Sequence, residues 1–131
     1  MMVFDDYPRL ATEFMNQEHA EFAELVNQLE QGLQDGQRME SEMQALVEHV
    51  KDHFAHEEQE MQSVGFPPYP VHKGEHDRVI TLFEQQLAYH REASDNEPLL
   101  NFIREDVPAW FEQHLNTMDM VTARFLAMHQ L

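Results

Sequence analysis

The chain has 131 residues, 42% of them hydrophobic, which is enough for one core but leaves no room for a second domain of useful size. Its 25 acidic and 8 basic residues give a formal net charge of −17, so we expect no nucleic acid and no anionic membrane among its partners. Cysteine is absent, which excludes disulfides, thiolate metal sites and thiol nucleophiles. The N-terminus lacks the basic and apolar regions of a secretory signal, and no apolar run approaches the ~18 residues of a membrane span. We therefore expect a cytoplasmic monomer.

Apolar residues recur with a helical rather than an alternating period along most of the chain. We expect the first helix to begin near Asn16, acting as its N-cap, and to fade at about residue 36. Pro108 should kink or restart the last helix just before Trp110. The other helical segments predicted from the periodicity cover residues 39–62, 69–91 and 99–128.

Four amphipathic helices joined by short connections predict an all-α fold, an antiparallel up-down-up-down four-helix bundle. We expect a single domain over residues 1–131, with residues 1–15 forming an irregular N-terminal arm packed across the bundle.

Charged and imidazole side chains interrupt the apolar stripes of these helices. With about 100° of rotation per residue, Glu57 falls near the middle of the stripe that contains Val50, and His53 falls at its edge. A carboxylate there would be a costly buried charge unless it is paired or bound to a metal. His49 and His56 turn away from the stripe, and we expect both to be solvated.

The remaining helices show the same conflict. His72 and His76 lie one turn apart on an apolar face, where they would form a chelating pair, whereas His90 is about 21 Å from His76 along the axis and cannot join them. In the last helix, His114 and Asp119 flank the apolar stripe on opposite sides. They are five residues apart and so do not share a face of an α-helix, which makes this the weakest of these signals. The candidates outside residues 53–76 are His19, His114 and Asp119.

Five inward histidines and two inward carboxylates need something to coordinate. Imidazole nitrogens and carboxylate oxygens without sulfur suit iron, manganese, copper or zinc. Seven such groups are more than one ion can use, and they fit two six-coordinate ions if both carboxylates bridge and a solvent-derived oxygen completes the cluster. The Glu-x-x-His pairs of ferritin-like di-iron proteins and the His-Glu-x-x-His motif of zinc proteases are both absent.

The run His53-Phe54-Ala55-His56-Glu57-Glu58-Gln59-Glu60-Met61 closely resembles the His-Phe-x-x-Glu-Glu-x-x-Met signature of hemerythrins. Their next motif is similar to His72-Lys73-Gly74-Glu75-His76. Their last motif is similar to Trp110 with His114-Leu115 through Asp119, and Glu18-His19 matches the first-helix histidine.

The resemblance implies two non-haem iron ions bridged by carboxylates and by an oxo or hydroxo group. It places His72, His76 and His114 on one ion, and His19 and His53 on the other, which keeps an open position. The bridging carboxylates would be Glu57 and Asp119.

Such a site implies reversible binding of dioxygen, for storage, transport or delivery to an oxygen-consuming enzyme, without catalysis. We expect an apolar pocket with no unassigned acid or histidine, a setting that favours binding over turnover. The alternatives are a di-iron enzyme or scavenger of peroxide or nitric oxide, and oxygen or redox sensing through a partner. The residues expected around the pocket are Phe22, Phe54, Leu115 and Met118, with Leu115 helping to keep water out.

Overall fold

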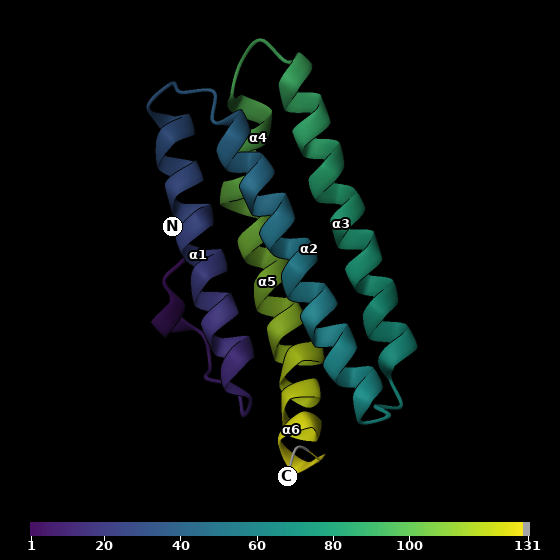
Figure 1. Cartoon of the computed structure of the whole chain (residues 1–131). Helices are drawn as coiled ribbons and strands as arrows, with labels where there is room; N and C mark the ends of the chain where they lie inside the picture. Colours follow the sequence, from purple (N-terminus) through teal and green to yellow (C-terminus); the bar gives the residue numbers. More distant parts are fainter. Residues whose placement is uncertain (130–131) are drawn as a thin grey trace.

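The computed structural model describes residues 1–129, and within them every regular element is helical. Three long helices, α1, α2 and α3, are followed by a fourth rod made of shorter helical pieces, and successive rods run in opposite directions (Figure 1). The predicted all-α, up-down-up-down four-helix bundle is therefore confirmed. The long helices are α1 (Glu13–Gln34), α2 (Glu40–Ser63) and α3 (Tyr69–Glu92).

The fourth rod changes its helical pitch twice. Its α-helical parts are α4 (Glu97–Asn101), α5 (Val107–His114) and α6 (Met120–His129). Two π-helical turns join them, η2 (Phe102–Asp106) and η3 (Leu115–Asp119). Pro108 has no N–H to donate, and a new α-helical segment does begin just before it, at Val107, although the backbone stays helical throughout.

Glycines end α1 and α2 in the same way. Gly36 and Gly65 have positive φ angles of 87° and 67°, a conformation that glycine adopts without strain. After α2, the N–H of Phe66 donates to the carbonyl of Met61 at 3.0 Å and the N–H of Gly65 donates to that of Gln62 at 3.2 Å. This pair of bonds satisfies the last carbonyls and turns the chain sharply, so that α3 returns alongside α2.

The N-terminal segment is shorter than predicted, because α1 begins at Glu13 rather than near Asn16. Asn16 does not cap the helix. It lies buried inside the first turns, where its side chain accepts a hydrogen bond from the N–H of Leu10 and donates one to the carbonyl of Leu10. At the start of the chain, Met2 is held in the same two-bond manner by the side chain of Asn27, so the arm is fastened along α1.

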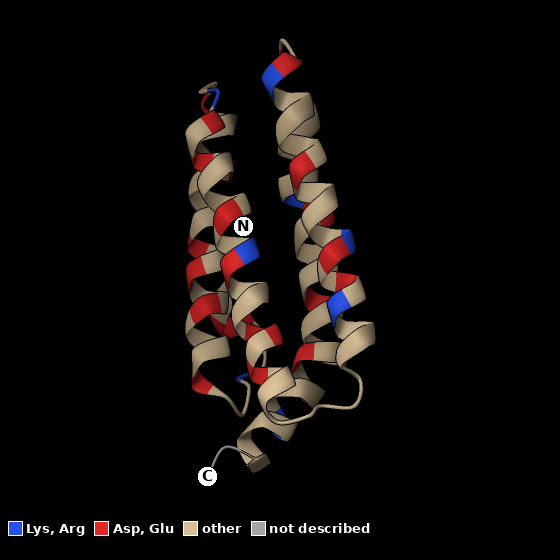
Figure 2. Ribbon diagram, turned by 45° about the vertical axis from the view of Figure 1, so that its right-hand side comes forward, with Lys and Arg blue, Asp and Glu red and all other residues tan. Residues whose placement is uncertain are grey.

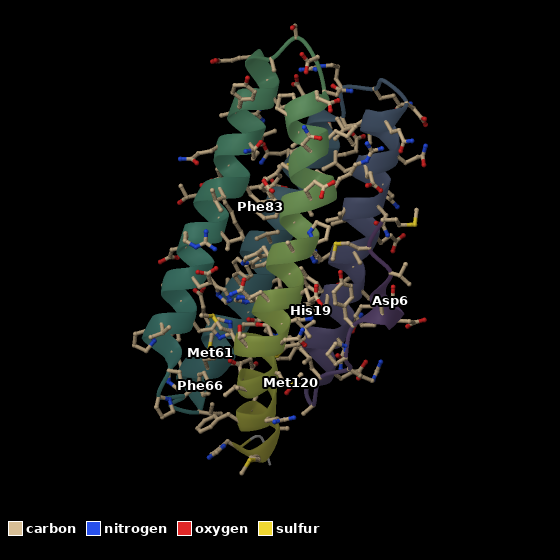
Figure 3. All side chains as sticks on the ribbon, turned by 180° about the vertical axis from the view of Figure 1, so that it is seen from behind. Asp6, His19, Met61, Phe66, Phe83 and Met120 are labelled. Carbon is tan, nitrogen blue, oxygen red and sulfur yellow. The ribbon has the colours of Figure 1, made fainter. Side chains whose placement is uncertain are left out.

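One apolar core runs along the bundle, and its two ends differ in chemistry. Figure 3 shows His19 in the half of the bundle that contains the α2–α3 turn, marked by Met61 and Phe66, whereas Phe83 lies in the opposite half. Acidic residues far outnumber basic ones along the ribbons (Figure 2). No helix within residues 1–129 combines the length and the apolar character needed to cross a bilayer.

Candidate metal centre

The structure brings all seven residues singled out from the sequence into one buried cluster. Each rod contributes, because the antiparallel arrangement places the beginnings of α1 and α3 level with the end of α2 and the middle of the fourth rod. Every one of these residues is at most 8% exposed, and Glu57 and His76 are fully buried. The members are His19, His53, Glu57, His72, His76, His114 and Asp119.

The two oxygens of Glu57 face different histidines. Its Oε2 lies 2.7 Å from Nε2 of His53 and 3.8 Å from Nε2 of His19. Its Oε1 lies 3.3 Å from Nε2 of His76 and 3.5 Å from Nε2 of His72. The carboxylate therefore spans two groups of imidazoles.

Asp119 spans the same two groups from the opposite rod. Its Oδ1 lies 3.1 Å from Nε2 of His114 and 3.2 Å from Nε2 of His72, whereas its Oδ2 lies 3.2 Å from Nε2 of His19. His72, His76 and His114 thus lie around Oε1 of Glu57 and Oδ1 of Asp119. His19 and His53 lie on the side of the other two carboxylate oxygens. This arrangement matches two ions bridged by two carboxylates.

The cluster has the character of a metal centre by two further tests. Ligand atoms within 4.8 Å of one another form two overlapping groups that share Glu57, one of five residues and one of three. Several buried polar atoms of the cluster also form no hydrogen bond of regular geometry among the described residues, although imidazole nitrogens lie close to them, and a cation would satisfy these atoms. These atoms include both oxygens of Glu57, Nε2 of His76 and Oδ1 of Asp119.

The π-helical turn η3 explains how His114 and Asp119 act together. In an α-helix, residues five apart do not share a face, and on that ground the sequence signal was weak. A π-helical turn bonds residue i to residue i+5, which brings residues five apart into line. The turn Leu115–Asp119 follows His114 directly and places the Asp119 carboxylate beneath its imidazole.

Partners behind the histidines were not predicted from the sequence. Nδ1 of His53 lies 2.7 Å from a Glu18 carboxylate oxygen, and the other oxygen of Glu18 lies 2.7 Å from Nδ1 of His56. Nδ1 of His76 donates to Glu58 at 2.9 Å. Such outer hydrogen bonds fix the ring orientation and leave Nε2 free for a metal. Nδ1 of His72 is held in the same way, 2.9 Å from Oγ1 of Thr122.

The imidazoles and carboxylates of the cluster shift one another's pKa values toward the ionised forms. Burial lowers the pKa of His53, but the adjacent Glu57 and Glu18 carboxylates outweigh burial and raise that pKa to about 10. Burial and the nearby Asp119 charge raise the pKa of Glu57, yet the imidazoles around it hold this pKa well below its usual range. The pKa of Asp119 is lowered in the same way, chiefly by His114 acting against burial.

A small apolar cavity lies against the two-histidine side of the cluster. Its volume is about 10 Å³, room for about one water-sized molecule. His19 and His53 line it together with five apolar side chains, among which the expected Phe22 and Phe54 are present. The remaining lining residues are His49, Val50, Trp110, Phe111, His114 and Asp119.

Several expectations about this pocket and its surroundings are corrected. Leu115 is buried in the core, as its place on the stripe predicts, but it does not line the cavity. Met118 lies on an outer hollow instead, because the π-helical turn displaces it from the stripe of a regular α-helix. His49, which is not among the assigned ligands, lines the cavity, although no unassigned histidine was expected there. It is half-buried rather than solvated, and its Nε2 donates to the carbonyl of Glu18 at 3.1 Å. His56 is also half-buried, through its contact with Glu18, while His90 lies outside the cluster as expected.

These features define a class of protein: a four-helix bundle whose core holds a two-metal site of histidines and carboxylates. Comparison with known proteins gives the family. Residues 10–126 match the model of the Hemerythrin HHE cation binding domain. The chain therefore belongs to the hemerythrin family.

Individual relatives agree with this assignment. The chain is 31% identical over 115 residues to a bacteriohemerythrin of Aquifex aeolicus, covering 86% of this chain and 88% of that protein. It is 32% identical over 112 residues to a bacteriohemerythrin of Ralstonia nicotianae, covering 83% and 77%. The crystal structure of a wild-type hemerythrin superposes with a TM-score of 0.84 at 25% identity, covering 97% of this chain and 98% of that one.

The family and the cluster together establish the chemistry of the cofactor. The protein is a non-haem iron, oxygen-binding protein of this family, with a di-iron centre as its cofactor. The buried cluster of five histidines and two carboxylates is the group of side chains within residues 1–129 that fits two such ions.

Proposed function

We propose that this chain binds dioxygen reversibly for storage, transport or delivery, and that its two irons are held by the seven clustered residues. The observation that carries the proposal is the small apolar cavity lying directly against His19 and His53. We further propose that the protein works as a cytoplasmic monomer that releases oxygen to an oxygen-consuming enzyme.

We assign His72, His76 and His114 to one ion, and His19 and His53 to the other. Glu57 and Asp119 would bridge the two, since each carboxylate directs one oxygen to either side. With one solvent-derived bridge, the first ion would have six ligands and the second would have five. The open position would therefore belong to the ion beside the cavity.

When bound, the ion pair supplies two electrons together and takes them back, which is what reversible dioxygen binding requires. The protein's part is to place and shield that chemistry. Phe22, Phe54 and Phe111 give the cavity an apolar wall that admits a neutral diatomic gas and disfavours bulk water. Glu18 and Glu58 hold the rings of His53 and His76 in the orientation that aims Nε2 at the ions.

Binding without turnover follows from the absence of a proton source in the cavity wall. Asp119 is the one acid that lines the cavity within the described residues, and its oxygens are directed to the histidines. His49 is the one lining histidine outside the cluster. The Nε2–H of His49 donates outward to the Glu18 carbonyl.

The test is to fill the protein anaerobically with ferrous iron and to cycle it between oxygen and argon while recording the visible spectrum. A charge-transfer absorption that appears and disappears over many cycles is expected. His129→Ala, which changes an exposed histidine far along α6, should cycle like the parent protein, whereas His53→Ala should not. Prompt irreversible oxidation would contradict the proposal, and steady oxygen uptake with a reductant present would favour an enzyme or scavenger.

A further inference from the structure

The cavity beside the proposed iron site has only two half-buried residues in its wall. Eight of its ten lining side chains are fully buried. The other two are His49, between α1 and α2, and Trp110, on the side of α3. His49 and Trp110 are therefore the points at which the wall of the cavity comes nearest to solvent.

Trp110 lies between the cavity and a neighbouring groove. A groove of about 230 Å³ lies between α3 and the fourth rod, and Trp110 is the one residue that lines both this groove and the cavity. The groove is largely apolar, and apolar surroundings favour an uncharged gas over water. Its apolar lining residues are Val79, Leu82, Phe83, Phe102, Val107 and Trp110 itself.

Two side chains of α3 hold the indole of Trp110 in place. Its Nε1–H donates to Oε1 of Glu75 at 3.2 Å. Glu75 is held in turn by Arg78, whose Nε donates to Oε2 of Glu75 at 3.0 Å. On its inner side the ring stacks on His114 with centroids 4.9 Å apart. One hydrogen bond therefore keeps the ring from turning outward.

We propose that the Trp110 indole is the gate through which dioxygen passes between the α3–α5 groove and the cavity, and that Glu75 is a positioning residue that holds this gate closed. The inference rests on the proposed function, because it names the route to the same site. The hydrogen bond is present in the closed gate whether or not dioxygen is bound. Its loss therefore destabilises both closed states equally and lowers the barrier to opening from each, so entry and exit speed up together.

The His49 side offers no comparable path. His49 is held to the Glu18 carbonyl, and its ring lies parallel to that of His53 with centroids 6.5 Å apart. The hollows of 230 and 220 Å³ around the fourth rod are lined by Trp110 and not by His49. An opening at Trp110 therefore leads into existing space.

The experiment compares Glu75→Ala with Glu75→Gln and with Glu84→Ala, a matched change on α3 at an exposed ion pair outside the groove. Stopped-flow mixing and release give the two dioxygen rate constants of the di-iron protein. Loss of one hydrogen bond predicts that Glu75→Ala raises both by about fivefold and leaves the equilibrium affinity within about twofold. Glu75→Gln keeps an acceptor oxygen and, like Glu84→Ala, should resemble the parent protein.

A second readout is independent of oxygen chemistry. Trp110 is the single tryptophan of the chain, so ultraviolet resonance Raman spectra in D₂O follow the exchange of its indole N–H without overlap. Exchange in the di-iron protein should also be faster by about fivefold in Glu75→Ala.

The two readouts separate the possible failures. Faster exchange with unchanged oxygen rates would mean that the indole moves but does not lie on the route, which overturns the proposal. If the dioxygen rate constants rise in His49→Ala but stay unchanged in Glu75→Ala, the route lies between α1 and α2, and this result also overturns the proposal. If the ferrous protein is oxidised without releasing oxygen, the proposed function fails. The gate is then tested by the oxidation rate at limiting oxygen, because oxidation also requires dioxygen to enter the cavity.

Discussion

At the scale of single residues, Glu57 is the group on which the cluster depends most. It is fully buried, and its two oxygens face imidazoles on both sides. Burying a carboxylate among Val50, Phe54 and Met61 is costly without a compensating cation. Its presence there is explained by the ions that it would bridge.

Glu57→Ala should therefore remove both irons rather than one. Each ion would lose a ligand and a bridging negative charge, so metal analysis should give close to no iron per chain. His56→Ala is the control one residue away, and it should keep two irons because His56 contacts Glu18 and not the cluster. Loss of iron in His56→Ala, with retention in His53→Ala, would reverse the assignment of the α2 face.

Phe111 should govern how long the ferrous form survives in air. It lines the cavity and packs edge-on against His19 with centroids 5.2 Å apart. Phe111→Leu should admit water and hasten irreversible oxidation, followed as loss of the oxygen-dependent spectrum. Phe66→Leu removes the same atoms from a buried site away from the cavity, and it should cost a similar ~1 kcal/mol of stability without hastening oxidation.

The cluster residues could be predicted from the sequence because each is a polar residue on, or at the edge of, an otherwise apolar stripe. Their outer partners could not. Glu18 and Glu58 lie on the flanks of their helices, where a carboxylate needs no explanation, and only the packing of neighbouring helices brings them to His53 and His76. The Glu18-His19 pair indicates a metal-binding histidine, but nothing in the sequence indicates that the Glu18 side chain reaches across to α2.

At the scale of elements, the π-helical turn η3 is what lets the fourth rod present two ligands. A π-helical turn holds one residue more than an α-helical turn. The periodicity of the sequence could not reveal it, since a projection with a constant rotation of about 100° per residue holds only for a regular α-helix. The same projection misplaced Met118, whereas the ranges of α2 and α3 were predicted within one residue.

Deletion of one residue from this turn should therefore be tolerated. Removing the exposed Asn116 leaves His114 and Asp119 four residues apart, which is the spacing that shares a face in a regular α-helix. Two irons per chain are expected. Deletion of the exposed Ala55 is the matched control in α2, which has no extra residue to lose, and it should turn His53 away from Glu57 by about 100° and abolish iron binding. Equal loss of iron in both deletions would show that the extra residue itself is required.

At the scale of the whole molecule, the metal centre joins all four rods, so its removal should loosen the entire bundle. Ligands that bind only the folded state add stability by mass action. The metal-free protein should melt well below the di-iron form, as followed by circular dichroism. Overlapping melting curves would argue against a centre in the core.

The stability of the metal-free form should also depend on pH in two directions. The pKa of His53 rises from 6.5 to about 10 on folding, so its contribution is complete below pH 6.5 and is lost as the pH rises toward 10. The lowered pKa values of Glu57 and Asp119 contribute stability above their ordinary values of 4.5 and 3.8, and this stability is lost as the pH falls. Urea titrations should therefore find the highest free energy of unfolding between pH 4.5 and 6.5.

The acidic surface gives the bundle a selectivity of its own between gases and ions. A formal charge of −17, carried on all four rods (Figure 2), repels anions approaching any entrance to the core but exerts no force on neutral dioxygen. Raising the ionic strength from about 0.01 M to 1 M shortens the screening length from about 30 Å to 3 Å. The association rate of azide with the ferric protein should therefore increase with salt, while that of dioxygen with the ferrous protein should stay constant. Equal salt dependence of the two rates would contradict this. A difference between them means that the acidic surface slows the association of small oxidising or inhibitory anions and does not affect that of dioxygen.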